Sequence, residues 1–152
     1  MNTQLICRKC GEPHDIDDFY LTHRGKRDGT CKYCRIKSVM EKYNSNPYRS
    51  WAKNTKAHHE SKGVVVDFSM DELERVARIH DRCMLCGKPL HYGRKENGNT
   101  SDNSPTLTSV NNSNHIDKNS VFVLCIKCNS LMQNRSMVEL LDFCRMIIHK
   151  FG

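Results

Sequence analysis

The chain has 152 residues, of which 38% are apolar and 7% aromatic, so it holds one ordinary domain or two small ones with thin cores. No window contains the roughly 18 consecutive apolar residues of a membrane span, and the start MNTQLICRKC lacks the apolar core of a secretory signal, which predicts a cytoplasmic protein. The formal charge is +7, with 13 Lys or Arg against 7 Asp or Glu in residues 1–62 and 11 against 10 in residues 63–152. This uneven basic surplus favours a polyanionic partner over the alternative of a solvated basic face.

Nine cysteines are present, and eight of them form four C-x-x-C pairs. The pairs are Cys7/Cys10, Cys31/Cys34, Cys83/Cys86 and Cys125/Cys128, and Cys144 is left over. A disulfide framework would need an oxidising compartment, so two four-cysteine zinc sites are the better interpretation. Because Zn²⁺ with four thiolates carries a charge of about −2, two such sites would lower the formal total to about +3.

Residues 5–34 form the first expected unit. Cys7-Arg-Lys-Cys10-Gly11 predicts a tight knuckle, because two thiolates share one turn and the glycine accepts a positive φ. Cys31 and Cys34 follow twenty residues later, with Phe19-Tyr20 between the pairs as a small apolar plug. This spacing is typical of a zinc ribbon or a related pair of knuckles.

Residues 32–62 are polar, basic and helical in character. Asn46-Pro47 divides them into two helices, since the residue before proline avoids the α region. His58-His59 has no partner pair at ligand spacing, so both histidines are expected to be exposed. Basic residues between Arg24 and Lys62 are expected to contact DNA phosphates; they are Arg24, Lys26, Arg27, Arg35, Lys37, Lys42, Arg49, Lys53, Lys56 and Lys62.

A strand-then-helix pattern leads to the third cysteine pair. Residues 64–68 predict a short strand, and Ser69-Met-Asp-Glu72 is a capping box that starts a helix ending near His80. This helix leads directly to Cys83-Met-Leu-Cys86-Gly87, the second knuckle. Residues 91–104, which follow the knuckle, are rich in Gly, Asn and Ser and predict a long mobile loop.

Two strands are predicted at residues 105–110 and 120–124, and the second leads into Cys125 and a short helix. A second capping box at Ser136 starts a last helix that ends near Lys150. The apolar residues expected to be buried along this helix are Leu140, Leu141, Cys144, Ile147 and Ile148, with Cys144 as an unreactive thiol.

The order helix, C-x-x-C-G, loop, strand, loop, strand, C-x-x-C-N, helix over residues 69–150 resembles the HNH nuclease superfamily, in the subset whose ββα core is held by a four-cysteine zinc. The first knuckle with its Phe19-Tyr20 resembles the one that precedes this core in many bacteriophage members, and phage recombination endonuclease VII is a more distant likeness. The resemblance implies a small α+β zinc protein with a zinc-ribbon-like knuckle at 1–36, a basic helical linker at 37–63 and an HNH-like ββα-metal domain at 64–152. For a viral protein the location would be the bacterial host's cytoplasm.

In that family, an Asp at the end of the first strand and an Asn or His on the helix hold one divalent metal at the scissile phosphate, and a His beside the Asp activates water. Asn129 matches the helix ligand, but Thr108 stands at the Asp position and Ser109 at the base position. A neutral hydroxyl is a poor Mg²⁺ ligand, and serine does not accept a proton near neutral pH. Asn111 and Met132 also replace a family carboxylate and lysine, so the resemblance implies a nuclease fold that no longer cuts.

Asn114-His115-Ile-Asp117 offers a substitute motif in which His115 would be the base. Only nine residues separate His115 from Cys125, which leaves little room for a loop and a strand, so His115 is expected to be a loop residue. It is nevertheless the best catalytic candidate if the protein cuts DNA.

The leading interpretation is therefore a DNA-binding protein with a degenerate HNH-like core, two structural Zn²⁺ ions and duplex or branched DNA as its partner. One alternative is an active endonuclease that uses Asn129 and His115 with Mg²⁺ or Mn²⁺. Another is a phage-type zinc protein that binds and regulates a host protein. The sequence leaves the oligomeric state open.

Overall fold

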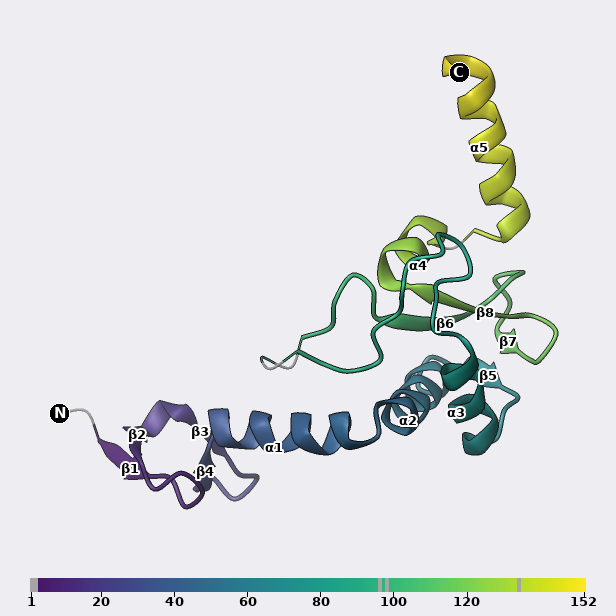
Figure 1. Cartoon of the computed structure of the whole chain (residues 1–152). Helices are drawn as coiled ribbons and strands as arrows, with labels where there is room; N and C mark the ends of the chain where they lie inside the picture. Colours follow the sequence, from purple (N-terminus) through teal and green to yellow (C-terminus); the bar gives the residue numbers. More distant parts are fainter. Residues whose placement is uncertain (1–2, 96, 98, 134) are drawn as a thin grey trace. The chain divides into compact units, whose positions relative to one another are not determined.

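The computed structural model describes residues 3–95, 97, 99–133 and 135–152 (Figure 1). The chain forms two compact units, one of residues 1–45 with 94–99 and one of residues 46–93 with 100–152. Among the described residues, no helix is both long and apolar enough to cross a membrane.

The first unit is built from two small hairpins and one helix. β1 (Gln4–Ile6) pairs antiparallel with β2 (Pro13–Asp15), and after a short 3-10 turn (Ile16–Asp18) β3 (Phe19–Leu21) pairs with β4 (Arg27–Cys31). The helix α1 (Lys32–Ser45) follows β4 directly. Phe19 is buried among Cys7, Cys31 and Cys34, whereas Tyr20 is exposed, so the apolar plug consists of the phenylalanine alone.

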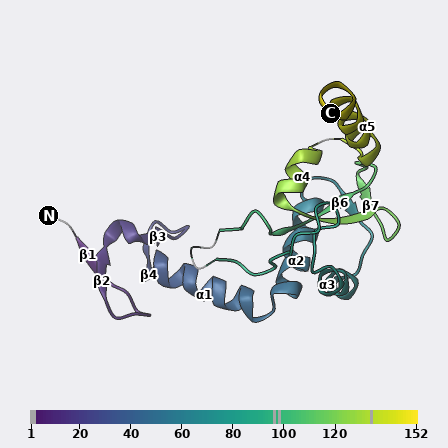
Figure 2. The same cartoon turned by 45° about the horizontal axis from the view of Figure 1, so that its top comes forward.

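The core of the second unit lies between two helices and a hairpin. α2 (Pro47–Glu60) begins at the predicted break, where the Asn46 side chain accepts the Arg49 amide at 3.1 Å. α2 packs on α3 (Met70–Ile79), whose predicted capping box is confirmed by reciprocal bonds between Ser69 and Glu72 (Figure 2). The buried residues of this core are Trp51, Ala52, Val66, Phe68, Leu73, Ala77, Tyr92, Leu107, Ile116 and Val123.

The two predicted strands near the C-terminal half are confirmed as a hairpin. β6 (Pro105–Ser109) pairs antiparallel with β8 (Val121–Cys125), in a register that runs from Pro105 opposite Cys125 to Ser109 opposite Val121. β8 leads without a loop into α4 (Ile126–Met132), since Cys125 is the N-cap of that helix. The result is a strand–strand–helix unit that carries the last cysteine pair.

The expectation that His115 lies in a loop was wrong. β7 (His115–Ile116) pairs in parallel with β5 (Val65–Val66), with Val65 opposite His115. The Val65 amide donates to the Asn114 carbonyl at 2.8 Å, and the Asp67 amide donates to the Ile116 carbonyl at 2.9 Å. The spacing argument failed because it counted only the residues before Cys125 and missed a partner strand fifty residues earlier in the chain.

The last helix, α5 (Met137–Phe151), starts at the predicted Ser136–Glu139 capping box, but the expected buried stripe was wrong. None of its residues is buried, and Cys144 is exposed. Only Met137 and Leu140, near its start, pack partly against the small core around Cys83 and Leu124. An amphipathic pattern identifies the face that prefers to be covered, and it does not specify what covers it.

Candidate zinc sites and nucleic-acid surface

The first four-cysteine cluster consists of Cys7, Cys10, Cys31 and Cys34, whose sulfur atoms all lie within 4.8 Å of one another. The amides of Lys9 and Cys31 donate to the Cys7 sulfur at 3.4 and 3.3 Å. Gly11 has a φ of +76°, and its amide donates to the Cys7 carbonyl at 2.9 Å, which closes the knuckle. Four convergent sulfurs with amide donors behind them fit a tetrahedral structural Zn²⁺.

The second cluster, Cys83, Cys86, Cys125 and Cys128, repeats this geometry. The Cys125 amide donates to the Cys83 sulfur at 3.3 Å and the Cys128 amide to the Cys125 sulfur at 3.4 Å. Gly87 has a φ of +71° and bonds back to the Cys83 carbonyl. Cys83 and Cys86 follow α3, Cys125 ends β8, and Cys128 lies in α4. A metal bound by all four would therefore join the hairpin and α4 to the end of α3.

Backbone amides lower the pKa of one thiol in each cluster, whereas burial raises the pKa of another thiol in the first cluster. The Cys10 and Cys31 amides lower the pKa of Cys7 to about 6. Burial raises the pKa of Cys83, but the amides of Cys86 and Cys125 outweigh it, and the pKa is again about 6. Burial raises the pKa of Cys34 to about 12. Without a cation the four thiols therefore resist ionising together, and a bound Zn²⁺ would stabilise all four thiolates.

His14 is a neighbour of the first cluster that sequence reasoning missed. Its Nε2 atom lies 3.3 Å from the sulfur of Cys10, the exposed member of the set. Histidine at this distance can hydrogen-bond a metal-bound thiolate from outside the coordination sphere. In the sequence, the contact is indicated only by the position of His14 four residues after Cys10. That spacing does not predict a contact by itself, because the contact also depends on the pairing of β2 with β1.

The two positions in β6 where the resemblance implies catalytic residues lie on opposite faces of the hairpin. Ser109 is buried on the same face as Leu107, and its hydroxyl lies 3.4 Å from that of Ser113. Thr108 lies on the opposite face because side chains alternate along a strand. That face includes Leu124, which packs with Cys128 of α4, so Thr108 is on the side of the hairpin that α4 covers.

The other three positions of the expected site differ in their burial. Asn129 is half-buried in α4, directly after the zinc ligand Cys128. Met132, which stands where the family has a lysine, is buried with Leu124 and Cys128 and is a core residue. Asn111 is exposed beyond the end of β6.

The substitute motif is held by local hydrogen bonds. His115 has an exposed side chain, and its backbone bonds the Ser113 hydroxyl through both its carbonyl, at 2.6 Å, and its amide, at 3.2 Å. The Asp117 carboxylate accepts the amides of Asn119 and Ser120 at 2.9 and 2.8 Å. The Ser120 hydroxyl and the Asn119 amide lower the pKa of Asp117, so this carboxylate is ionised but committed to its own turn.

The expectation that both histidines of the pair at 58–59 are exposed was wrong for His59. Its Nε2 atom lies 3.0 Å from the Leu107 carbonyl in β6, and the side chain is half-buried. Burial lowers its pKa, with smaller effects of the same sign from His58 and Lys62 and an opposing one from the Leu107 carbonyl. A neutral imidazole that donates to this carbonyl links α2 to the hairpin. His58 is exposed as predicted.

The ten basic residues predicted to contact DNA fall into two groups. Arg27 pairs with Asp17, Arg35 with Asp28, and Arg49 with both Asp71 and Glu74. Lys56 donates to the Phe68 carbonyl at 2.6 Å and lies near Glu60. The remaining six are exposed and take part in none of the ion pairs found among the described residues; they are Arg24, Lys26, Lys37, Lys42, Lys53 and Lys62. We call these six the unpaired basic set.

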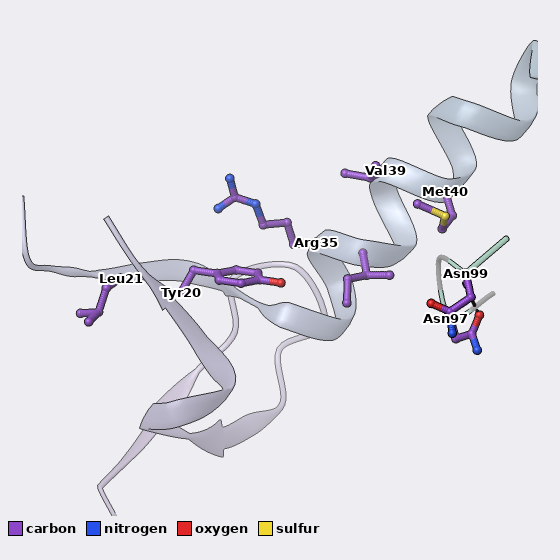
Figure 3. Close-up of a pocket in the computed structure, with 8 residues that line it drawn as sticks. Tyr20, Leu21, Arg35, Val39, Met40, Asn97 and Asn99 are labelled. Atoms are coloured by element: carbon purple, nitrogen blue, oxygen red, sulfur yellow. Dashed lines mark hydrogen bonds between the residues drawn. The ribbon is translucent and has the colours of Figure 1, made fainter. Parts of the chain in front are cut away.

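Arg35 also belongs to an open hollow along α1 in the first unit (Figure 3). Its guanidinium lies 5.4 Å from the centre of the Tyr20 ring, as a cation–π contact. The hollow has a volume of about 450 Å³ and includes the apolar side chains of Leu21, Val39 and Met40. Arg35 is thus fixed by Asp28 and Tyr20, which makes it less available than its neighbour Lys37.

Within the described residues, the groups of three or more His, Cys, Asp or Glu ligand atoms that lie close enough to share a metal ion are the two cysteine clusters. Thr108 contributes a hydroxyl side chain to the face of the hairpin that α4 covers. The chain is a small α+β protein with two four-cysteine clusters that fit zinc.

No protein-family model matches the chain. No curated protein matches it either. Among solved structures, the chain is similar to PacI, described as a rare-cutting HNH restriction endonuclease with an unusual mechanism of DNA perturbation. The identity is 16%, the match covers 90% of this chain and 87% of that chain, and the TM-score is 0.45.

Proposed function

We propose that this protein is a DNA-binding zinc protein whose HNH-like ββα unit serves as a binding scaffold and has lost efficient cleavage. The observation that supports this most directly is the arrangement of the second cluster. Cys125 and Cys128 join β8 to α4, while Thr108 offers a hydroxyl on the face that α4 covers. This arrangement supports a nuclease-like scaffold in which a hydroxyl replaces the hard oxygen ligand that Mg²⁺ prefers.

The unpaired basic set supports DNA as the partner. Lysine and arginine side chains that are already in ion pairs gain little from a phosphate, because an existing carboxylate partner has to be displaced. The six exposed side chains of this set, which take part in no ion pair among the described residues, can replace the counterions of a phosphate backbone. Phosphate contacts of this kind give affinity and orientation with little sequence preference.

The loss of cleavage rests on three positions. Thr108 is neutral, Ser109 is buried and faces away from α4, and the ionised Asp117 is committed to the amides of its own turn. A metal-dependent hydrolysis needs both a carboxylate-held cation and a base at the water, and neither is formed by these residues.

An active endonuclease is the second candidate, and the exposed side chain of His115 favours it. To decide between the two, purified zinc-loaded protein is incubated with supercoiled, linear and branched DNA in Mg²⁺ and in Mn²⁺. We expect gel retardation without nicking. Nicking that is abolished by His115→Ala or Asn129→Ala, with retardation unchanged, would establish the endonuclease instead.

The host-protein alternative is separated in the same preparation. If capture of a bacterial protein on the immobilised chain survives nuclease treatment and the free chain does not retard DNA, the DNA-binding proposal is wrong. If the captured material disappears on nuclease treatment, DNA is the bridge and the proposal stands.

A further inference from the structure

The two cysteine knuckles are copies of one local pattern. Residues 7–14 read CRKCGEPH and residues 83–90 read CMLCGKPL, with cysteine, cysteine, glycine and proline at the same four positions. In each, the amide of the first cysteine donates to the carbonyl of the residue five positions later, at 3.0 Å in the first knuckle and 2.9 Å in the second. The residue before the first cysteine pairs antiparallel with the proline in both. The two sites can therefore be compared position by position.

The last position of the pattern differs between the copies. In the first knuckle it is His14, whose Nε2 atom lies 3.3 Å from the sulfur of Cys10. In the second it is Leu90, an apolar side chain that packs with the core around Cys83 and offers no ligand atom. Cys10 and its counterpart Cys86 are the exposed members of their clusters. In the part of the chain that the structure describes, only the first site has an imidazole within hydrogen-bond distance of its exposed sulfur.

The position of His14 does not depend on the Cys10 side chain. His14 lies in β2, opposite Leu5 of β1 in the hairpin register (Figure 1). Its ring contacts the ring of the buried Phe19 in a T-shaped arrangement, with the ring centres 6.2 Å apart. Neither the strand pairing nor the ring contact involves the Cys10 sulfur. The imidazole would therefore stay beside this ligand position if the thiol were lost.

A structural zinc site accepts three thiolates and one imidazole as well as four thiolates. In the first site, the ligand atoms that all lie within 4.8 Å of one another are the four sulfurs, so His14 stands outside the set while Cys10 is a ligand. If the Cys10 sulfur leaves the metal, the position that opens is the one beside His14. The exchange breaks one zinc–sulfur bond and forms one zinc–nitrogen bond, and it changes the formal charge of the site from about −2 to about −1.

We propose that His14 is a reserve ligand of the first zinc site, which binds the metal in place of Cys10 when that thiolate is lost from it. The first site then holds its metal with three thiolates and one imidazole. The second site has Leu90 at the matching position and therefore has no such replacement.

The first test counts the zinc ions bound to the full-length chain by native mass spectrometry. Cys10→Ala is expected to keep two ions, because His14 replaces the lost thiolate. Cys86→Ala, the same change in the second site, is expected to keep one. Cys10→Ala combined with His14→Leu should also fall to one, since the leucine reproduces the second knuckle. Cys10→Ala combined with His23→Leu is the control and should keep two, because His23 is an exposed histidine of the same unit.

Direct ligation is checked by NMR of the cadmium-loaded Cys10→Ala protein, which should show scalar coupling between the metal and the His14 ring. A single bound ion in Cys10→Ala, two ions in its combination with His14→Leu, or the absence of this coupling would overturn the proposal.

The second test keeps all eight cysteine ligands, so it does not depend on the folding of a ligand variant. The rate of zinc transfer to excess EDTA is measured for wild type, His14→Leu and His14→Gln. Release of one of the two ions should be at least about tenfold faster in both variants, because an opened Cys10 position is no longer filled by an imidazole. Glutamine can donate a hydrogen bond to the Cys10 sulfur but is a poor zinc ligand. Release from His14→Gln at the wild-type rate would show that His14 acts through a hydrogen bond alone and would contradict the proposal.

Discussion

The indole N–H of Trp51 in α2 donates to the carbonyl of Pro105, the first residue of β6, at 2.9 Å. Trp51 and Pro105 are both buried. Pro105 lies opposite the zinc ligand Cys125 in the hairpin register, so this hydrogen bond ties α2 to the base of the strand pair beside the second cluster. The helix predicted as part of a basic linker thus supplies the residue that anchors the hairpin.

Replacing Trp51 with Phe should therefore lower the free energy of unfolding by about 1–3 kcal/mol, because the Pro105 carbonyl would lose its buried donor. Urea denaturation at saturating zinc, followed by circular dichroism, measures the change. Tyr33→Phe serves as the control, since the exposed Tyr33 hydroxyl makes none of the hydrogen bonds found in the described residues. Equal stability of wild type and Trp51→Phe would mean that the hydrogen bond is not made in solution.

Removing a zinc ligand should have a much larger effect. Cys125→Ser is expected to lower the bound zinc from two ions to one per chain and to unfold the hairpin and α4, since structural zinc contributes on the order of 10 kcal/mol to folding. Metal content by mass spectrometry of the native protein gives the count. Cys144→Ser should keep both ions, because Cys144 lies outside the clusters. Loss of zinc from both variants would refute the ligand assignment.

The half-buried His59 predicts a specific pH dependence. Burial lowers its pKa in the folded state below the unfolded value of about 6.5, so the unfolded state binds more protons as the pH falls through that value. The contribution to stability is thus complete above about pH 6.5 and is lost progressively below it. NMR titration of the His59 imidazole should give a midpoint below the unfolded value of about 6.5. In His59→Gln, the fall in stability between about pH 7 and pH 5.5 should be smaller than in wild type.

Local patterns in the sequence predicted much of this fold. The knuckles at Cys7 and Cys83, the break at Asn46 and both capping boxes depend on residues within four positions of one another, and all are present. The hairpin was predictable as well, because buried side chains alternate along β6, and β8 is a short apolar run that ends at Cys125.

Contacts between distant segments were not predictable in the same way. The parallel pairing of Val65 with His115 involves strands of only two residues each, which are too short to show a period. The partners of Arg27, Arg35 and Arg49 lie between seven and 25 residues away, so the sequence could not separate paired from unpaired basic residues. The apolar stripe of α5 was recognised from its spacing, but its solvent exposure was not predicted.

The division of the basic residues predicts a selective effect on DNA binding. Lys37→Gln and Lys42→Gln remove unpaired charges from α1, and each should weaken binding to any DNA sequence and reduce the salt slope by about one if that side chain contacts a phosphate. Arg49→Gln is the comparison, since the Arg49 charge is already opposed by Asp71 and Glu74. Fluorescence anisotropy with a labelled duplex distinguishes them. An Arg49→Gln effect as large as that of the lysine variants would show that ion pairing does not decide which residues contact DNA.

The most direct test of the central claim is the dependence of DNA affinity on salt for the zinc-loaded wild-type protein. Each phosphate contact contributes about −0.9 to the slope of the logarithm of the association constant against the logarithm of salt concentration. If all six residues of the unpaired basic set contact phosphates, the slope is about −5, with the duplex recovered intact after incubation in Mg²⁺. Binding that does not change with salt, or that is absent at low salt, would contradict the account.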